Sequence, residues 1–176
     1  MLTRDYHSAF WNYLSQAQKD LILEGDYLMY DIVEDCKYSF KDYSFLVFPY
    51  AKTYEGFLKQ LAYDSGFIGH LDYISDHLRM GKLLSPFLVG RLGDKSLYRR
   101  IKEYTTKELA EQAWYTWRNG RNQVFHYFPH NLKSISFEEA GTINANIIST
   151  MEKLYQEIYL PIQAAKEHVT VEQLVQ

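Results

Sequence analysis

The residue types best suited to chemistry lie together in one segment, Arg121-Asn122-Gln123-Val124-Phe125-His126. A neutral imidazole accepts a proton and a charged one donates it, so His126 has the chemistry of a general base or acid. The guanidinium of Arg121 suits a phosphate that gains negative charge, and Asn122 suits orienting that phosphate or the imidazole. These types predict RNA cleavage in which the substrate's own 2′-hydroxyl attacks, a reaction that needs no metal and no cofactor.

The spacing within this segment leaves two geometries open. Asn122 and His126 are four residues apart and share a helix face. Arg121 and His126 are five apart, about 140° around an α-helix. Either the helix loosens there, or the two side chains act from neighbouring faces of one groove. Gly120 is unusual at this place, since glycine inside a helix costs about 1 kcal/mol relative to alanine. A purely structural alternative is a surface arginine followed by a histidine near the helix end at Pro129.

The Arg-Asn-x-x-x-His pattern resembles the R-x4–6-H motif of HEPN ribonucleases. The resemblance implies a small all-helical bundle that cleaves RNA as a homodimer, with two such motifs paired at the interface. Arg121, Asn122 and His126 match in spacing, in the Asn after the Arg, and in their late position in the chain.

A second stretch, Phe48 to Lys59, resembles a helix of RNase LS-type (RnlA/LsoA) toxins that carries a Glu-Gly-aromatic-aliphatic-Lys pattern. In those toxins a Glu of this helix joins the Arg and the His of the active site, and the matching residue here is Glu55. The resemblance covers roughly residues 43–130. It implies a toxin of a toxin–antitoxin or antiviral defence system that a cognate antitoxin holds silent.

Two features of the chain depart from these families. The RNase LS-type toxins carry additional N-terminal domains, and this chain resembles their HEPN domain alone. Another HEPN branch continues the motif as His-x-Tyr and is silenced by modification of that Tyr. In this chain Tyr127 directly follows His126, so the sequence gives no support for silencing by tyrosine adenylylation.

Glu55 also has an interpretation from the residues themselves. It lies in an apolar helical segment between Tyr54 and Gly56, and a glycine there lets another chain or a ligand approach closely. A carboxylate beside His126 would orient the ring and raise its pKa. The structural alternative is a buried ion pair with Arg121 that only holds the bundle together.

Charge is unevenly distributed along the chain. Residues 79–107 carry eight Lys/Arg and two Asp/Glu, or +6, whereas residues 1–78 carry −6 and residues 108–176 carry −3. A basic block in an acidic chain predicts attraction to a polyanion, although an ordinary solvated face is the alternative. The residues predicted to bind RNA are Arg118, Arg99, Arg100 and Lys95.

The elements that must position these residues are predicted to be helices. The 176-residue length suggests a single domain over 1–176, and the pattern predicts an all-α bundle of four to six helices with no hairpin. The expected helices cover 3–23, 26–38, 45–63, 106–128 and 136–159, with short helices and loops over 66–103. Leu28, Ile32 and Val33 are expected to face inward, and Pro161 is expected to follow the last main helix. Residues 165–176 are expected to be a frayed tail or a short helix.

The remaining features constrain location and partners. One cysteine excludes an internal disulfide and a cysteine-based zinc site, and it suggests a reducing cytoplasm. We see no signal peptide and no stretch of roughly 18 apolar residues, so no membrane association is expected. A metal site is not expected, although His70, Asp72, Asp76 and His77 have spacings that helices bring together.

Three hypotheses from different classes therefore remain. The first is a metal-independent endoribonuclease of the HEPN class that forms a homodimer, has RNA as substrate and is bound by an antitoxin. The second is a catalytically silent HEPN-like module that binds RNA or a protein partner. The third is an unrelated helical protein. Intact Arg121, Asn122, His126 and Glu55 favour the first hypothesis over the second.

Overall fold

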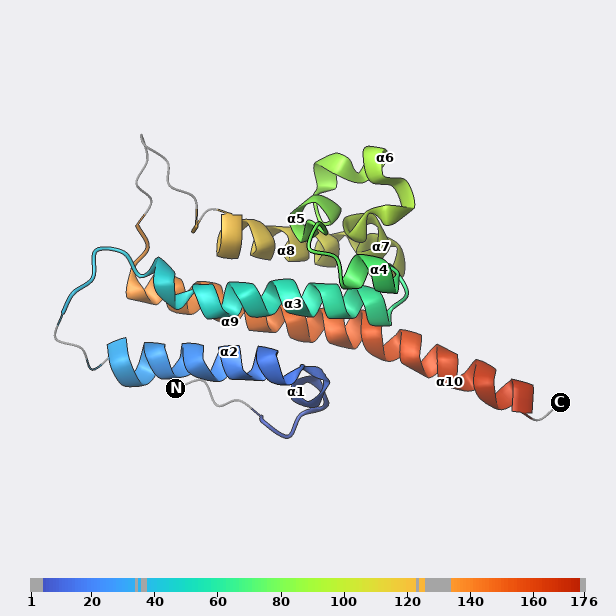
Figure 1. Ribbon diagram of the computed structural model, residues 1–176, viewed down its shortest axis with the longest axis horizontal. Coiled ribbons are helices and arrows are strands. Elements are labelled where there is room, and N and C mark those ends of the chain that lie inside the picture. The colour runs from blue at the N-terminus through green and yellow to red at the C-terminus, as the bar shows by residue number, and fades with distance from the viewer. Residues whose placement is uncertain (1–4, 34, 36–37, 123, 126–133, 175–176) are drawn as a thin grey trace. The chain divides into compact units, whose positions relative to one another are not determined.

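All regular secondary structure in the described part of the chain is helical, which confirms the predicted all-α class (Figure 1). The computed structural model describes residues 5–33, 35, 38–122, 124–125 and 134–174. Within them, six α-helices have eight residues or more: α2 (Gln16–Asp26), α3 (Phe48–Asp64), α7 (Leu97–Tyr104), α8 (Lys107–Trp117), α9 (Phe137–Leu154) and α10 (Leu160–Leu174).

Shorter helical pieces connect these six. The short α-helices are α1 (Ala9–Tyr13), α4 (His70–Tyr73), α5 (Met80–Leu83) and α6 (Val89–Leu92). The 3₁₀ turns are η2 (Ser44–Leu46), η3 (Pro86–Leu88) and η4 (Gly93–Lys95), and the π-helical segments are η1 (Tyr27–Val33), η5 (Arg118–Asn122) and η6 (Tyr155–Tyr159). The predicted short helices and loops over 66–103 are confirmed.

The chain divides into two compact units. The first unit comprises Met1–Phe57 and Tyr115–Ser149, and the second comprises Leu58–Trp114 and Thr150–Gln176. Helices α3, α8 and α9 each contribute residues to both units. The single domain over 1–176 stays a prediction.

In the first unit, four helical segments pack around one apolar core. They are α2 with η1, the start of α3, the end of α8 with η5, and the start of α9. Ile22, Leu46 and Phe57 are fully buried, and the rings of Tyr54 on α3 and Trp117 on α8 lie 6.4 Å apart. Asn144 on α9 donates a hydrogen bond to the Leu46 carbonyl (3.2 Å), which ties α9 to the turn before α3.

The predicted first helix over 3–23 is wrong in its course. Ser8 caps α1, which ends at Tyr13, and Leu14 and Ser15 are extended. The helix restarts because Ser15 and Gln18 form a reciprocal capping box: Gln18 N donates to Ser15 Oγ, and Ser15 N donates to Gln18 Oε1. Residue 3, where we predicted this helix to begin, lies outside the described residues.

The predicted break at Glu24-Gly25 is also wrong, because the helix continues from α2 into η1. Gly25 is buried and serves close packing rather than helix termination. The π-helical geometry of η1 changes which residues face inward: Met29 and Val33 are buried, whereas Ile32 is exposed and Leu28 is intermediate. Of the three residues predicted to face inward there, only Val33 is buried.

Replacing Gly25 with alanine is expected to destabilise the fold by roughly 1–3 kcal/mol, the usual cost of overpacking. A Cβ atom at this position would lie 2.6 Å from Cε2 of Tyr50, a fully buried ring whose hydroxyl donates to Asp26. Urea denaturation measures the effect, with Gly90→Ala as the matched control, since nothing lies within 4 Å of a Cβ at Gly90. Equal denaturation midpoints for the two variants would contradict the prediction.

Local residue types explain where two of the longer helices begin or end. Pro49 lies in the first turn of α3, where its missing N–H costs nothing, and Gly66 ends the helix with a φ of +73°. Ser136 and Glu139 form a capping box before α9, where we predicted a helix to begin: Ser136 N donates to Glu139 Oε2 (2.8 Å), and Glu139 N donates to Ser136 Oγ (3.2 Å).

In the second unit, the end of α3 contacts two distant parts of the chain. The Asp64 carbonyl accepts hydrogen bonds from Gln163 and Lys166 of α10, and Lys59 Nζ donates to the Ser75 carbonyl. Helices α8 and α9 meet where Gln112 donates to Thr150 (3.1 Å). The core of this unit includes the fully buried side chains of Leu58, Leu61, Met80, Leu84 and Ile101.

The prediction that the last main helix ends before Pro161 is wrong. Helix α9 continues through η6 into α10, which reaches Leu174. The π-helical turn Tyr155–Tyr159 immediately precedes Pro161, and such a turn relieves the clash and missing donor that a proline brings to a regular helix. No helix in the described part of the chain is both long and apolar enough to span a bilayer.

Candidate active site

The segment that carries Arg121 begins as a regular helix and then widens. Thr106 caps α8 by accepting a hydrogen bond from Leu109 N (3.1 Å). After Trp117 the helix becomes the π-helical η5, Arg118–Asn122. The sequence left open whether the helix loosens here, and it does. Phe125 N donates to the Arg121 carbonyl, and residues 126–128 of the predicted helix lie outside the described residues.

Gly120 is explained by the helix that packs against it. It is buried within η5, and a Cβ atom there would lie 3.0 Å from Cδ1 of Ile147 on α9. Glycine therefore allows α9 to approach the widened turn. π-helical turns are frequent at functional sites, because they change the direction in which side chains leave the helix.

Glu55 and Arg121 are brought together although they are far apart in the sequence. Arg121 Nε lies 3.2 Å from Glu55 Oε2, joining η5 to α3. The Arg121 side chain is 45% exposed and that of Glu55 is 33% exposed. The pair is therefore not the buried structural salt bridge considered from the sequence, and ion pairs this accessible contribute only about 0–1 kcal/mol to stability.

The guanidinium of Arg121 is held on a second side by an aromatic ring. Its central carbon lies 5.1 Å from the ring centroid of Trp117, which is itself buried. A cation over an indole face is attracted by the ring's electron density. Glu55 contacts the guanidinium at Nε. Arg121 is thus oriented by the carboxylate of Glu55 and by the ring of Trp117, while 45% of its side chain stays exposed.

Arg121 and Glu55 line a cavity of about 440 Å³ in the first unit. Its other lining residues are Phe48, Ala51, Lys52 and Phe125. The four α3 residues follow a spacing of three, one and three, which places them on one helix face. The volume falls within the range of about 300–1,000 Å³ typical of small-molecule sites, and the lining combines apolar rings with a few charged groups.

Of the two remaining residues predicted to be catalytic, Asn122 is described by the structure and His126 is not. Asn122 follows Arg121 as the last residue of η5 and is partly buried. His126 lies outside the described residues, so its predicted pairing with Glu55 stays a prediction. Tyr54, beside Glu55, is fully buried; burial raises its pKa, which keeps the phenol protonated and unsuited to proton exchange.

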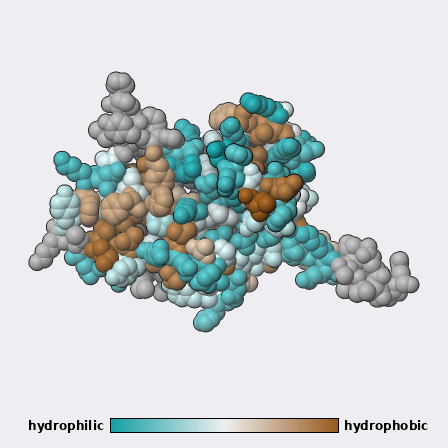
Figure 2. Space-filling view, in the orientation of Figure 1, coloured by the Kyte–Doolittle hydropathy of each residue, from teal (hydrophilic) through white to brown (hydrophobic). Residues whose placement is uncertain are grey.

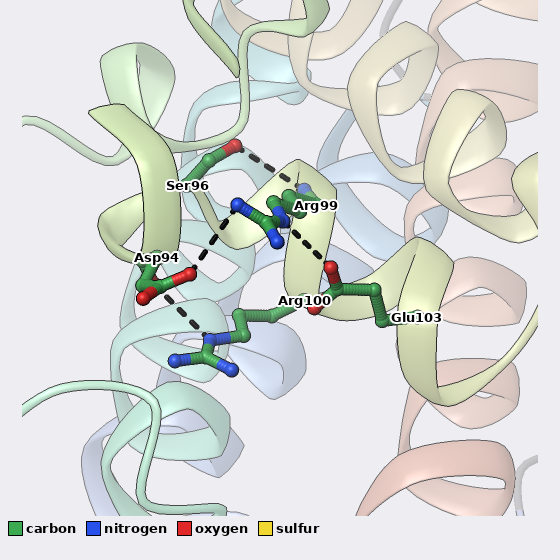
Figure 3. Close-up of polar contacts among 5 residues, drawn as sticks. All are labelled: Asp94, Ser96, Arg99, Arg100 and Glu103. Carbon is green, nitrogen blue, oxygen red and sulfur yellow. Dashed lines mark hydrogen bonds and ion pairs between the residues drawn. The ribbon is translucent and has the colours of Figure 1, made fainter. Parts of the chain in front are cut away.

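The predicted RNA-binding residues lie in different places. Arg118 is exposed on η5 of the first unit, whereas Lys95, Arg99 and Arg100 belong to the second unit. Figure 3 shows that Arg99 lies between two carboxylates, Glu103 at 2.6 Å and Asp94 at 3.3 Å. Glu103, by hydrogen bond and by charge, and then Asp94 raise the pKa of Arg99.

These contacts change the expected contribution of the basic block. Arg100 Nε donates to the Asp94 carbonyl (3.1 Å), so Asp94 engages both arginines (Figure 3). The charge of Arg99 is largely compensated within α7, which makes it a weaker phosphate contact than the sequence suggested. Lys95 is exposed on η4.

Two other candidate sites lack the side chains that a reaction or a metal would need. Within the described residues, no three His, Cys, Asp or Glu side chains gather as metal ligands, so His70, Asp72, Asp76 and His77 do not form a cluster there. A second hollow of about 460 Å³ is lined by residues 39–41, 43 and 134–139. Its carboxylates, Glu138 and Glu139, bond to Ser136 at the start of α9, and it contains none of the predicted site residues.

Sequence reasoning missed three side chains around Arg121. They are Lys52, Phe48 and Trp117. A helical spacing from Glu55 would have found the first two, since they lie three and seven residues before it. Trp117 lies four residues before Arg121, a spacing at which helical side chains meet. No protein-family model, curated protein or solved structure matches the chain.

Proposed function

We propose that this chain is a metal-independent endoribonuclease of the HEPN class. The observation that carries the proposal is the orientation of Arg121 by Glu55 and Trp117 at the wall of a cavity. A guanidinium fixed in this way is pre-organised to bind the two non-bridging oxygens of a phosphodiester, which gain charge during cleavage. The sequence motif adds His126 as the group that moves protons.

The proposed reaction is a transesterification within the substrate. The 2′-oxygen loses its proton and attacks the adjacent phosphorus, and the bond from phosphorus to the 5′-oxygen breaks. The 5′-oxygen takes up a proton and leaves as a hydroxyl, while the upstream fragment retains a 2′,3′-cyclic phosphate. His126 is the proposed proton-transfer group, Arg121 stabilises the charged intermediate, and Glu55 holds Arg121 in position.

Cleavage is expected to continue in the presence of EDTA and to produce 2′,3′-cyclic phosphate or its hydrolysed form together with 5′-hydroxyl ends. The reason is that the nucleophile belongs to the RNA and Arg121 supplies the positive charge. End-group analysis of a labelled oligoribonucleotide, with and without EDTA, measures both properties. Strict magnesium dependence with 5′-phosphate products would exclude this mechanism.

We further propose that the enzyme acts as a homodimer and as a toxin that an antitoxin silences. One motif supplies a single Arg121 and a single His126, whereas two-fold symmetry brings a second set without lengthening the chain. Specific activity is expected to fall on dilution as the dimer dissociates, which light scattering follows in parallel. A monomer with constant specific activity on dilution would exclude a site shared between two chains.

A further inference from the structure

Two exposed phenylalanines form the apolar end of the cavity that contains Arg121. Phe48 is 53% exposed and Phe125 is 41% exposed, although both are large apolar side chains. Their ring centroids lie 5.8 Å apart with an interplanar angle of 83°, so the edge of one ring meets the face of the other. Figure 2 shows hydrophobic residues gathered on the visible face over the first turns of α3.

The same cavity is polar at its other end. Lys52 and Glu55 follow Phe48 along α3, and Arg121 reaches Glu55 from η5. Seven residues of helix separate Phe48 from Glu55, a rise of about 10 Å. An aromatic surface and a cationic group in one cavity match a planar base joined to a phosphate, since a nucleotide presents both within one unit.

The charge of the cavity argues for RNA as its occupant. Its lining carries two cations, Lys52 and Arg121, and one carboxylate, Glu55. A phosphodiester chain complements the excess positive charge.

We infer that Phe48 and Phe125 form a base-binding subsite beside the scissile phosphate. A base next to that phosphate stacks on the ring of Phe48, and the ring of Phe125 forms the side wall of the subsite. Arg121 binds the phosphate. The inference rests on the proposed function and defines its substrate class as single-stranded RNA, because a base in a duplex is already stacked on its neighbours.

Binding of a short single-stranded RNA with 2′-O-methyl sugars tests the subsite in the full-length chain. This probe keeps its bases and phosphates but lacks the attacking hydroxyl, so binding is measured without cleavage. Phe48→Leu and Phe125→Leu keep apolar volume and remove the ring. Each is expected to raise Kd roughly tenfold, within the range that one stacked base contributes, and Phe48→Tyr is expected to restore binding.

The matched control is Phe87→Leu, which removes an exposed phenylalanine from the second unit and is expected to leave Kd unchanged. A probe that lacks the base beside the scissile linkage should bind the wild-type chain more weakly, to the same extent as the complete probe binds the Phe48→Leu chain. The Phe48→Leu chain should bind the abasic probe and the complete probe equally. Wild-type affinity in both leucine variants, or indifference to the abasic position, would overturn the inference. So would a Phe48→Leu chain that changes oligomeric state but not RNA affinity.

The outcomes separate this inference from the proposed function. Binding of the probe that depends on Phe48, without cleavage of unmodified RNA, supports the subsite and contradicts the ribonuclease. Cleavage with binding that is independent of Phe48 and Phe125 supports the ribonuclease and contradicts the subsite. Absence of both binding and cleavage overturns both.

Discussion

Replacing His126 with alanine is expected to lower the rate of RNA cleavage by about 10²- to 10⁴-fold, the usual contribution of a positioned general acid or base. Without an imidazole, water must take the proton from the 2′-hydroxyl and supply one to the leaving 5′-oxygen. In cells, expression of the wild-type chain is expected to arrest growth and degrade RNA, whereas the His126→Ala chain does neither.

Cleavage of a labelled oligoribonucleotide under single-turnover conditions measures this loss directly. His77→Ala is the matched control, because His77 is exposed in the second unit and has no part in the proposed reaction. Equal cleavage rates and equal toxicity for wild type and His126→Ala would remove His126 from the mechanism.

The longer helices could be predicted where local chemistry marks both ends. Helix α3 begins around Pro49 and ends at Gly66, and α9 begins at the Ser136–Glu139 capping box. These signals work because they depend on residues within one helical turn. The short helices over 66–103 were also predictable, since repeated Gly and Pro interrupt any longer helix there.

The boundaries that failed depend on partners distant in sequence. The break predicted between residues 23 and 26 does not occur, and Gly25 is small because Tyr50 of α3 packs against it. Pro161 was interpreted as a stop, but the π-helical turn before it lets the helix continue. The residues next to Gly25 and Pro161 in the sequence indicate neither the contact with Tyr50 nor the π-helical turn. The helix boundaries predicted from these two residues alone were therefore wrong.

In the candidate site, too, the features that depend on residues distant in the sequence were the harder ones to predict. The Glu55–Arg121 contact joins residues 66 positions apart, and only the resemblance to RNase LS-type toxins suggested that they belong together. The widening of the helix after Trp117 was one of two alternatives, because a spacing of five residues alone cannot decide between an α-helix and a π-helix. Lys52 and Phe48 were available from helical spacing but carry no chemistry until the cavity places them beside Arg121.

Replacing Arg121 with alanine is expected to reduce cleavage by about 10²- to 10³-fold, comparable to the loss of one donor to a charged intermediate. The free energy of unfolding is expected to change by about 1–2 kcal/mol at most, because the side chains of Arg121 and Glu55 are partly exposed. Chemical denaturation and single-turnover cleavage measure the two effects on the same preparation. Lys19→Ala, which removes a cation from α2 of the same unit, is the control for charge alone.

A double-mutant cycle tests whether Glu55 acts by positioning Arg121. Glu55→Gln keeps the shape of the side chain but weakens its hold on Nε, so it should lower activity less than Arg121→Ala does. Combined with Arg121→Ala it should cause little further loss, since a positioning residue has no effect once its partner is gone.

Arg121→Lys should restore only part of the activity, because an ammonium lacks the fork and the planar face that Trp117 supports. Full activity in Arg121→Lys, with a large loss of stability in Arg121→Ala, would make the pair structural and return Arg121 to the role of an ordinary surface cation.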